Sequence, residues 1–237
     1  MPIAIVSAMK EEMQLYLDTC TVTGTTERAG FAVHTAAHAG HDLLVVQCGV
    51  GKVHAAMCTQ LLIDRFDAEA VLCTGTAGAA HPDLDIGDLV VANDCVHHDI
   101  DVGFLGLPRG QIPFTDLRFF ETSPHLRTLA LEATLPEHTA HRGRVLTGDT
   151  FVQDAGYLQA VRDELGGDCV EMEGAAVGQV CTLNDVPYLV VRAISDRADG
   201  TSTDDFQAFL HDAAETSARL VLHLLDALDP DAVPHAL

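Results

Sequence analysis

The chain of 237 residues contains no tryptophan, few aromatic residues (5 %) and only two lysines, Lys10 and Lys52. Hydrophobic residues still make up 48 % of the sequence, so the core must be built from Ala, Val, Leu and Ile. An aliphatic core of this kind suits a sheet of buried strands that helices cover on both faces. The length is sufficient for one domain with a well-buried interior.

Positive charge is scarce, because 13 Lys and Arg residues face 35 Asp and Glu residues and give a formal net charge of −22. Such a surface repels the phosphates of nucleic acids and the headgroups of anionic lipids. We therefore expect neither a nucleic-acid partner nor a membrane partner. Most of the acidic residues are expected to be solvated groups that aid solubility.

Paired cysteines and long apolar runs are also missing. The seven cysteines are odd in number and form no C-x-x-C pair, which favours buried free thiols in a reducing compartment over a disulfide framework. No apolar run is long enough to span a bilayer, and no secretory leader pattern follows Met1. We expect a cytoplasmic protein.

Strand and helix patterns alternate along the chain. They predict a single α/β domain over residues 1–228, with a mixed central sheet flanked by helices on both faces, and a flexible C-terminal tail at 229–237. The predicted strands are 3–7, 31–38, 42–48, 70–75, 88–102, 143–148, 168–171 and 188–195, with a hairpin at Ala39-Gly40 and a glycine turn after residue 75. The predicted helices are 10–18, 52–65, 123–134, 155–164, 172–184 and 205–228, and 103–122 is expected to be a loop.

Two glycine-rich segments could face a ligand. GVGK at 49–52 lacks the phosphate-loop spacing, and His54 stands where a dinucleotide fingerprint has its third glycine, so we interpret it as a strand-to-helix turn. Unpaired N–H groups at that helix start could still contact a ligand. TGTAGAA at 74–80 follows a buried strand, and both a plain turn and a ligand-facing turn are open.

Acidic residues at strand ends are the strongest candidates for chemistry. Asp196 follows the buried run LVVRAIS; a partly desolvated Asp beside Ser195 could have a raised pKa and stay protonated near neutrality, or it could be a turn residue. Glu173 is costly to bury unless it is paired or binds a ligand such as a ribose diol, whereas Glu171 is interpreted as a helix cap. Glu12 alone would be interpreted as a helix-dipole acid.

A metal site is not expected. His97, His98, Asp99 and Asp101 are close in sequence, but neighbouring side chains on a strand point to opposite faces. The two histidines could not easily share one ion, and no ligand motif completes the set.

Taken together, seven segments resemble the methylthioadenosine/S-adenosylhomocysteine nucleosidases of the nucleoside phosphorylase superfamily. They occur in the family's order and cover about residues 1–228: IAIVSAMKEEM, GVGKVHAA, TGTAGAA, GDLVVANDCVHHDIDV, GDTFV, VEMEGAAV and VRAISDRAD. Each segment is weak evidence alone, but seven in order are specific. The resemblance implies hydrolysis of an N-glycosidic bond that releases adenine and a 5-thioribose, as in methionine salvage, without metal or organic cofactor.

The resemblance also implies residue roles. Asp196 would protonate adenine N7 with Ser195 orienting it, and Glu12 would activate the water near Arg192 and Thr76. The implied substrate-binding residues are Phe151 and Val152 at the base, Glu173 and Met172 at the ribose, and Met9, Val50 and Phe206 at the 5′ group. Ala77 and Gly78 are also expected to bind the substrate. The family works as a homodimer, so Val102, Leu105 and Pro113 of a partner copy would close the pocket.

Two departures from the family pattern and three alternatives remain. Thr76 replaces a frequent Ser and keeps the hydroxyl group, and Leu105 replaces a common Phe and could reshape the 5′ pocket. The alternatives are a purine nucleoside phosphorylase, an aminofutalosine-type nucleosidase with the same pocket, and a nucleoside-binding protein without activity. A phosphorylase needs a basic phosphate cradle, whereas the first loop here reads SAMKEEM.

Overall fold

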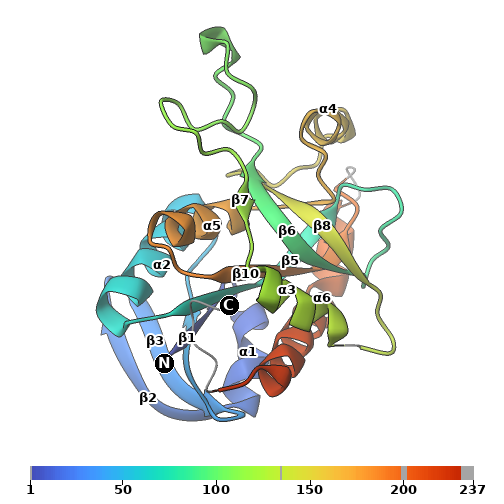
Figure 1. Cartoon of the computed structure of the whole chain (residues 1–237). Helices are drawn as coiled ribbons and strands as arrows, with labels where there is room; N and C mark the ends of the chain where they lie inside the picture. Colours follow the sequence, from blue (N-terminus) through green and yellow to red (C-terminus); the bar gives the residue numbers. More distant parts are fainter. Residues whose placement is uncertain (1, 134, 199–201, 231–237) are drawn as a thin grey trace.

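A computed structural model describes residues 2–133, 135–198 and 202–230, with side chains from residue 206 onward in the last range. The centre is a ten-stranded mixed sheet with helices on both faces (Figure 1). The strands are β1 (Ile3–Ser7), β2 (Thr21–Arg28), β3 (Phe31–His38), β4 (His41–Gln47), β5 (Ala70–Ala79), β6 (Leu89–His97), β7 (Phe120–Glu121), β8 (Ala140–Thr147), β9 (Cys169–Glu171) and β10 (Tyr188–Asp196). The helices are α1 (Lys10–Thr19), α2 (Lys52–Phe66), α3 (Pro124–Glu132), α4 (Ala155–Leu165), α5 (Gly174–Leu183) and α6 (Ser202–Ala227), with a short 3₁₀ helix η1 (Gly103–Leu105).

Part of the sheet closes on itself. Strands pair in the order β10-β6-β8-β9-β5, and β10 pairs β5 as well, which completes a ring of five strands. From β5 the sheet continues through β1, β4, β3 and β2. Because β1, β5 and β10 run parallel as neighbours, their carboxyl ends meet at one edge. In α/β sheets this edge is where ligands bind.

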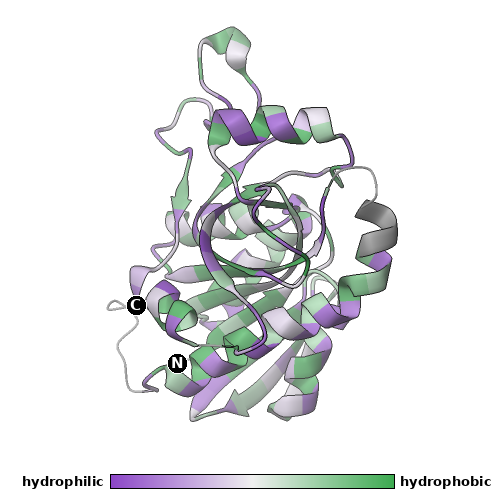
Figure 2. Ribbon diagram, turned by 90° about the vertical axis from the view of Figure 1, so that its right-hand side faces the viewer, coloured by the Kyte–Doolittle hydropathy of each residue, from purple (hydrophilic) through white to green (hydrophobic). Residues whose placement is uncertain are grey.

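The core is aliphatic on both faces of the sheet, as the composition predicted. One cluster packs α2 and α5 against one face, and a second packs α1, α3 and α6 against the other. A smaller cluster seats α4 over the ends of β6 and β8. Figure 2 shows green, hydrophobic strands in the middle of the molecule and purple residues spread over the surrounding helices. All seven cysteines are buried free thiols, also as predicted.

The predicted single α/β domain with a mixed sheet is confirmed, but two strands were missed. β2 reads TVTGTTER and is exposed at nearly every position, so it lacks the apolar alternation by which a strand is recognised. It forms because β3 offers a pairing edge across the turn at Ala29-Gly30. β7 has only two residues and lies inside the segment 103–122, which was expected to be a loop throughout.

The predicted glycine turn after residue 75 is wrong, because β5 continues to Ala79 and is buried along its length. Gly75 and Gly78 instead make room for other side chains. A Cβ at Gly75 would lie 2.5 Å from Glu12 Oε1, and a Cβ at Gly78 would lie 2.9 Å from Asp196 Oδ1. Glycine inside a strand often marks such a close approach. The ligand-facing interpretation of this segment therefore applies to a strand end rather than to a turn.

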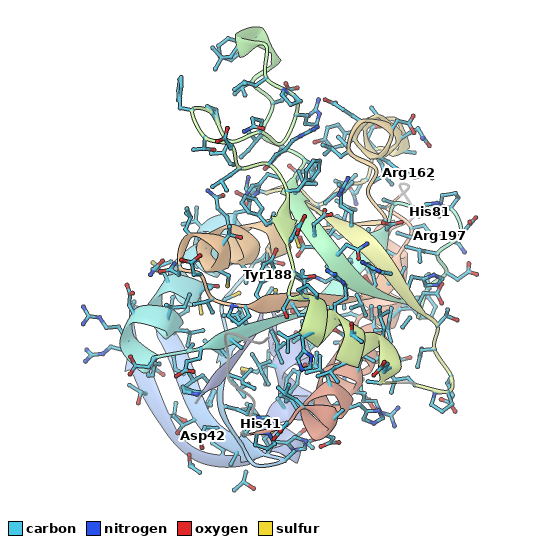
Figure 3. All side chains as sticks on the ribbon, viewed as in Figure 1. His41, Asp42, His81, Arg162, Tyr188 and Arg197 are labelled. Atoms are coloured by element: carbon cyan, nitrogen blue, oxygen red, sulfur yellow. The ribbon has the colours of Figure 1, made fainter. Side chains whose placement is uncertain are left out.

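The end of the last helix is fixed to the sheet. His41 Nε2 lies 3.2 Å from the carbonyl oxygens of both Leu225 and Leu228, at the place labelled in Figure 3. A donor at this position satisfies carbonyl groups that a helix end leaves free. The tail predicted at 229–237 lies outside the described residues from 231 onward. Within the described ranges, no helix is both long and apolar enough to cross a membrane.

Candidate active site

A cavity of about 340 Å³ opens at the edge where β1, β5, β9 and β10 end. Its lining residues are Ala8, Met9, Glu12, Val50, Thr76, Ala77, Gly78, Phe151, Val170, Glu171, Met172, Glu173, Ser195, Asp196 and Phe206. Val152 lines a smaller cavity of about 30 Å³ that shares Gly78, Phe151 and Asp196 with the first. The structure therefore brings together, from distant segments, every cavity residue that the resemblance implied for one chain, with Arg192 behind them.

Glu12 is held in place by four donors. Its Oε2 accepts hydrogen bonds from the N–H groups of Ala8 and Met9, both at 2.9 Å. Its Oε1 accepts from the N–H of Thr76 at 3.0 Å and from the Thr76 hydroxyl at 3.3 Å. As the third residue of α1, Glu12 can reach back to the residue before the helix. Burial raises the pKa of Glu12, although Arg192 and these backbone donors act against the rise.

Asp196 stands at the end of β10, beside a bulge. Ile194 pairs with Ala77 and Asp196 pairs with Gly78, so Ser195 is an additional residue opposite β5. Ser195 Oγ donates to Asp196 Oδ2 at 3.0 Å, and the N–H of Ala198 donates to Oδ1 at 2.9 Å. Bulges of this kind re-aim a side chain next to a binding site. Here both neighbours, Ser195 and Asp196, line the same cavity.

Arg192 lies behind the cavity and is almost fully buried. Its Nε donates to Glu171 Oε2 at 3.1 Å, and its Nη2 donates to the same oxygen and lies 3.7 Å from Glu173 Oε2. Glu171 also accepts from the N–H groups of Glu173 and Gly174 at the start of α5, as a helix cap does. The cap interpretation of Glu171 is therefore correct, but its pairing with Arg192 gave no signal in the sequence.

Glu173 is a buried carboxyl group with a strongly raised pKa. Its Oε1 accepts a hydrogen bond from the N–H of Gly51 at 2.7 Å. Burial and the neighbouring Glu171 raise the pKa of Glu173 to about 8, against the opposing effects of Arg192 and the Gly51 N–H. Three buried glutamates thus share one guanidinium, which makes the cavity favourable for a ligand that develops positive charge.

The opposite part of the cavity is apolar. The rings of Phe151 and Phe206 meet edge to face, with centroids 5.7 Å apart and planes at 71°. Met9 and Val50 line the same cavity. Phe151 remains 43 % exposed, so a flat ring could stack on it at the cavity mouth. An uncharged aromatic ligand with an apolar substituent suits this combination of surfaces.

Val102, Leu105 and Pro113 do not line this cavity within the chain. They belong to the segment that projects from the body above β7 in Figure 1. Phe104 and Phe114 are 86 % and 96 % exposed there, and Leu105 borders a separate depression. Their predicted place in a partner's pocket stays a prediction.

His97 and His98 point to different neighbours, as alternation along a strand requires. His97 Nε2 lies 3.0 Å from Gln179 Oε1, and His98 Nδ1 lies 2.8 Å from the Tyr157 hydroxyl. Burial lowers the pKa of both histidines. Among the described residues, no group of three or more His, Cys, Asp and Glu side chains is arranged to hold a metal ion.

The fold and this cavity have relatives. The chain belongs to the phosphorylase superfamily, whose family model matches residues 2–226. It is 36 % identical over 231 residues to a 5′-methylthioadenosine/S-adenosylhomocysteine nucleosidase of Bacillus thuringiensis, a match that covers 96 % of this chain and 100 % of the relative.

Solved structures agree in fold. The nucleosidase of the same name from S. pneumoniae with the transition-state inhibitor MT-ImmA superimposes with a TM-score of 0.92 at 33 % identity, covering 97 % of this chain and 100 % of the other. The Colwellia psychrerythraea nucleosidase in complex with adenine superimposes with a TM-score of 0.94 at 34 % identity, and the match covers 98 % of both chains. The futalosine hydrolase of Helicobacter pylori superimposes with a TM-score of 0.91 at 35 % identity. This match covers 96 % of this chain and 98 % of the other.

Replacing Arg192 should leave buried carboxylates uncompensated. We expect Arg192→Met to lower the free energy of unfolding by about 3–5 kcal/mol at neutral pH, as measured by urea denaturation. The matched control is Arg219→Met, because Arg219 is 55 % exposed and lies 3.9 Å from Glu215 on the same helix. This control should cost less than about 1 kcal/mol. Equal losses for the two variants would contradict the central role of Arg192.

The pKa of Glu173 predicts how stability depends on pH. The folded state holds the proton up to a pKa of about 8, whereas the ordinary value is 4.5. Between these values the unfolded chain binds fewer protons, so stability falls as pH rises, by at most about 1.4 kcal/mol per pH unit from this group. Between about pH 5 and pH 8, the free energy of unfolding should depend less steeply on pH in Glu173→Gln than in the wild type. The exposed Glu132→Gln should keep the original slope.

Proposed function

We propose that this protein is an N-ribosyl hydrolase that releases adenine from 5′-methylthioadenosine and S-adenosylhomocysteine. One observation carries the proposal: Glu12 and Asp196, from opposite ends of the sequence, line one cavity of about 340 Å³. Two relatives that match 96 % of this chain carry the name of nucleosidases for these substrates. Two of the similar structures hold, by their names, a transition-state inhibitor and adenine.

The chemistry needs an acid and a base on opposite sides of the bond. As the bond between C1′ and adenine N9 breaks, positive charge develops on the sugar and negative charge on the base. Asp196, oriented by Ser195 and the Ala198 N–H, would give its proton to N7. Glu12 would take a proton from the water whose oxygen bonds to C1′. Inverting glycosidases divide the work between two carboxyl groups in the same way.

The surroundings of Glu12 support its part as the base. Burial raises its pKa, which increases its affinity for a proton, while Arg192 and the backbone donors of Ala8, Met9 and Thr76 act against the rise. The Thr76 hydroxyl donates to Glu12 Oε1 at 3.3 Å and could turn toward the water. The negative charge of this corner stabilises the cationic sugar of the transition state.

The remaining cavity residues fit the parts of such a substrate. Glu173, with Met172 beside it, would accept hydrogen bonds from the ribose hydroxyls. Phe151 would stack on adenine, and Val152 would contact the edge of the base. Ala77 and Gly78 of β5 would also contact the substrate. Met9, Val50 and Phe206 provide apolar contacts for a thioether at the 5′ position. In this proposal, the ribose would lie over the carboxyl groups and the flat base would lie against Phe151.

The alternatives are less well supported. A phosphorylase must hold phosphate, yet no Lys or Arg is among the described residues that line the cavity, and Arg192 behind it is engaged by glutamates. A protein that only binds nucleosides would not need both Glu12 and Asp196. An aminofutalosine-type substrate remains the second candidate, because a futalosine hydrolase is among the similar structures.

Adenine release tests this function. Wild-type protein should hydrolyse methylthioadenosine and adenosylhomocysteine without phosphate. The rate of adenine release from 6-amino-6-deoxyfutalosine should be compared with the rates for these two substrates. Asp196→Asn and Glu12→Gln should each reduce kcat by about 10²–10⁴-fold, because each removes one positioned proton carrier. The exposed pair Asp64→Asn and Glu132→Gln should retain activity. A strict requirement for phosphate would overturn the hydrolase assignment.

We further propose a homodimer in which Val102, Leu105 and Pro113 of each copy cover the other's cavity. The exposed Phe104 and Phe114 in the same projecting segment support this, because apolar side chains gathered on a loop are usually covered. Light scattering should give a dimer, and Leu105→Asp should shift it toward monomer and raise KM. Val22→Asp, at an exposed apolar residue of β2, is the control that should leave both unchanged. A wild-type monomer at micromolar concentration would end the proposal.

A cytoplasmic location and a place in methionine salvage complete the proposal. The seven buried thiols, none of them in a disulfide, suit a reducing compartment. Cell fractionation with detection of the chain in the soluble fraction would test the location.

A further inference from the structure

An ion pair close in sequence to two cavity residues, Val50 and Phe151, has no part in the proposed chemistry. Lys52 is one of two lysines in the chain, and its Nζ donates to both oxygens of Asp99, at 2.7 and 2.8 Å. The two side chains are 20 % and 25 % exposed, so the pair is only partly shielded from water. Burial raises the pKa of Asp99, but the bonds from Lys52 and from the Asp149 N–H outweigh it and lower that pKa below its ordinary value.

The ion pair connects three chain segments. The backbone N–H of Lys52 donates to Asp149 Oδ1 at 2.8 Å, and the N–H of Asp149 donates to Asp99 Oδ2 at 3.0 Å. Lys52 therefore joins the start of α2, the segment after β6 and the segment after β8 in one closed set of contacts. The first of these segments carries Val50 and the last carries Phe151, both of which line the cavity.

Helix energetics do not explain a lysine at this position. Lys52 is the first residue of α2, where the positive end of the helix dipole disfavours a cation. Gly51 before it offers no side chain as a cap, and the first N–H groups are accepted by Glu173 and Asp149 from distant segments. The pairing with Asp99 is thus the contact that offsets the unfavourable placement.

We propose that Lys52 is a positioning residue that fixes the Gly51 N–H against Glu173 and so sets the grip on the ribose hydroxyls. The proposal rests on the function proposed above. Lys52 does not line the cavity, so it would act through its neighbour in the chain. The Gly51 N–H lies 2.7 Å from Glu173 Oε1, and its donation lowers the pKa of Glu173 against the opposing effect of burial. A loosened turn would leave this carboxyl group less well oriented.

Lys52→Met tests the proposal, because it keeps the apolar stem and removes the ammonium group. Its kcat/KM for methylthioadenosine should fall by about 10–100-fold, the scale on which small misplacements affect catalysis. With the 2′,3′-dideoxy analogue as substrate, which offers Glu173 no hydroxyl groups, the same substitution should change kcat/KM by less than about threefold. A role in general stability alone would lower the two values equally, which would overturn the proposal.

Three variants complete the experiment. Lys10→Met is the matched control, because Lys10 is also the first residue of its helix but is exposed; it should keep wild-type kcat/KM. Lys52→Arg should retain most of the wild-type kcat/KM, because it keeps a cation that can pair with Asp99. Asp99→Asn keeps an acceptor for the Asp149 N–H and replaces Lys52→Met if that variant fails to fold. It should show the same fall in kcat/KM for methylthioadenosine and the same small change for the dideoxy analogue.

The outcomes separate the two proposals. A wild-type protein that releases no adenine from any of the three nucleosides overturns the proposed function, and the role of Lys52 falls with it. An active wild type with Lys52→Met equal to Lys10→Met overturns the positioning role alone.

Discussion

The arrangement of one guanidinium among three buried glutamates underlies the site. Arg192 bonds to Glu171, lies near Glu173 and acts electrostatically on Glu12. One positive charge cannot neutralise three carboxylates, so the cluster retains protons more readily than separate glutamates would, as the pKa of about 8 for Glu173 indicates. Burying such a cluster costs stability unless each oxygen finds donors. The result is a negatively charged surface on this side of the cavity.

Space for this cluster is created by missing side chains. Arg192 Nη1 and Glu12 Oε1 both approach Gly75 so closely that a Cβ there would lie 2.8 and 2.5 Å away. Most donors to the carboxylates are backbone N–H groups, which carry no net charge and are held by the sheet and the helix starts. The charged groups are therefore oriented by the most rigid parts of the fold, and small residues in β5 are as necessary as the acids.

The fold was predictable where burial leaves a clear apolar pattern, as in the continuous apolar runs of β1 and β10. The exposed β2 carries no such pattern and was missed. Among the site residues, Asp196 stood out because an acid follows a buried run, whereas Glu12 resembled an ordinary helix-start acid and depended on the family resemblance. The contact of Lys52 with Asp99 could not be predicted, because it depends on how separate loops meet in space. The end of β5 was misread because glycines suggested a turn.

The bulge in β10 decides which of two adjacent side chains stands opposite Gly78. Regular pairing after Ile194 would bring Ser195 to that place, and Asp196 reaches it because one residue is skipped. A hydroxyl group cannot supply a proton at neutral pH as a carboxylic acid can. An enzyme and an inert binding protein could therefore differ by strand alignment with no active-site residue exchanged. During evolution, length changes in this strand should be tolerated less than many replacements around the cavity.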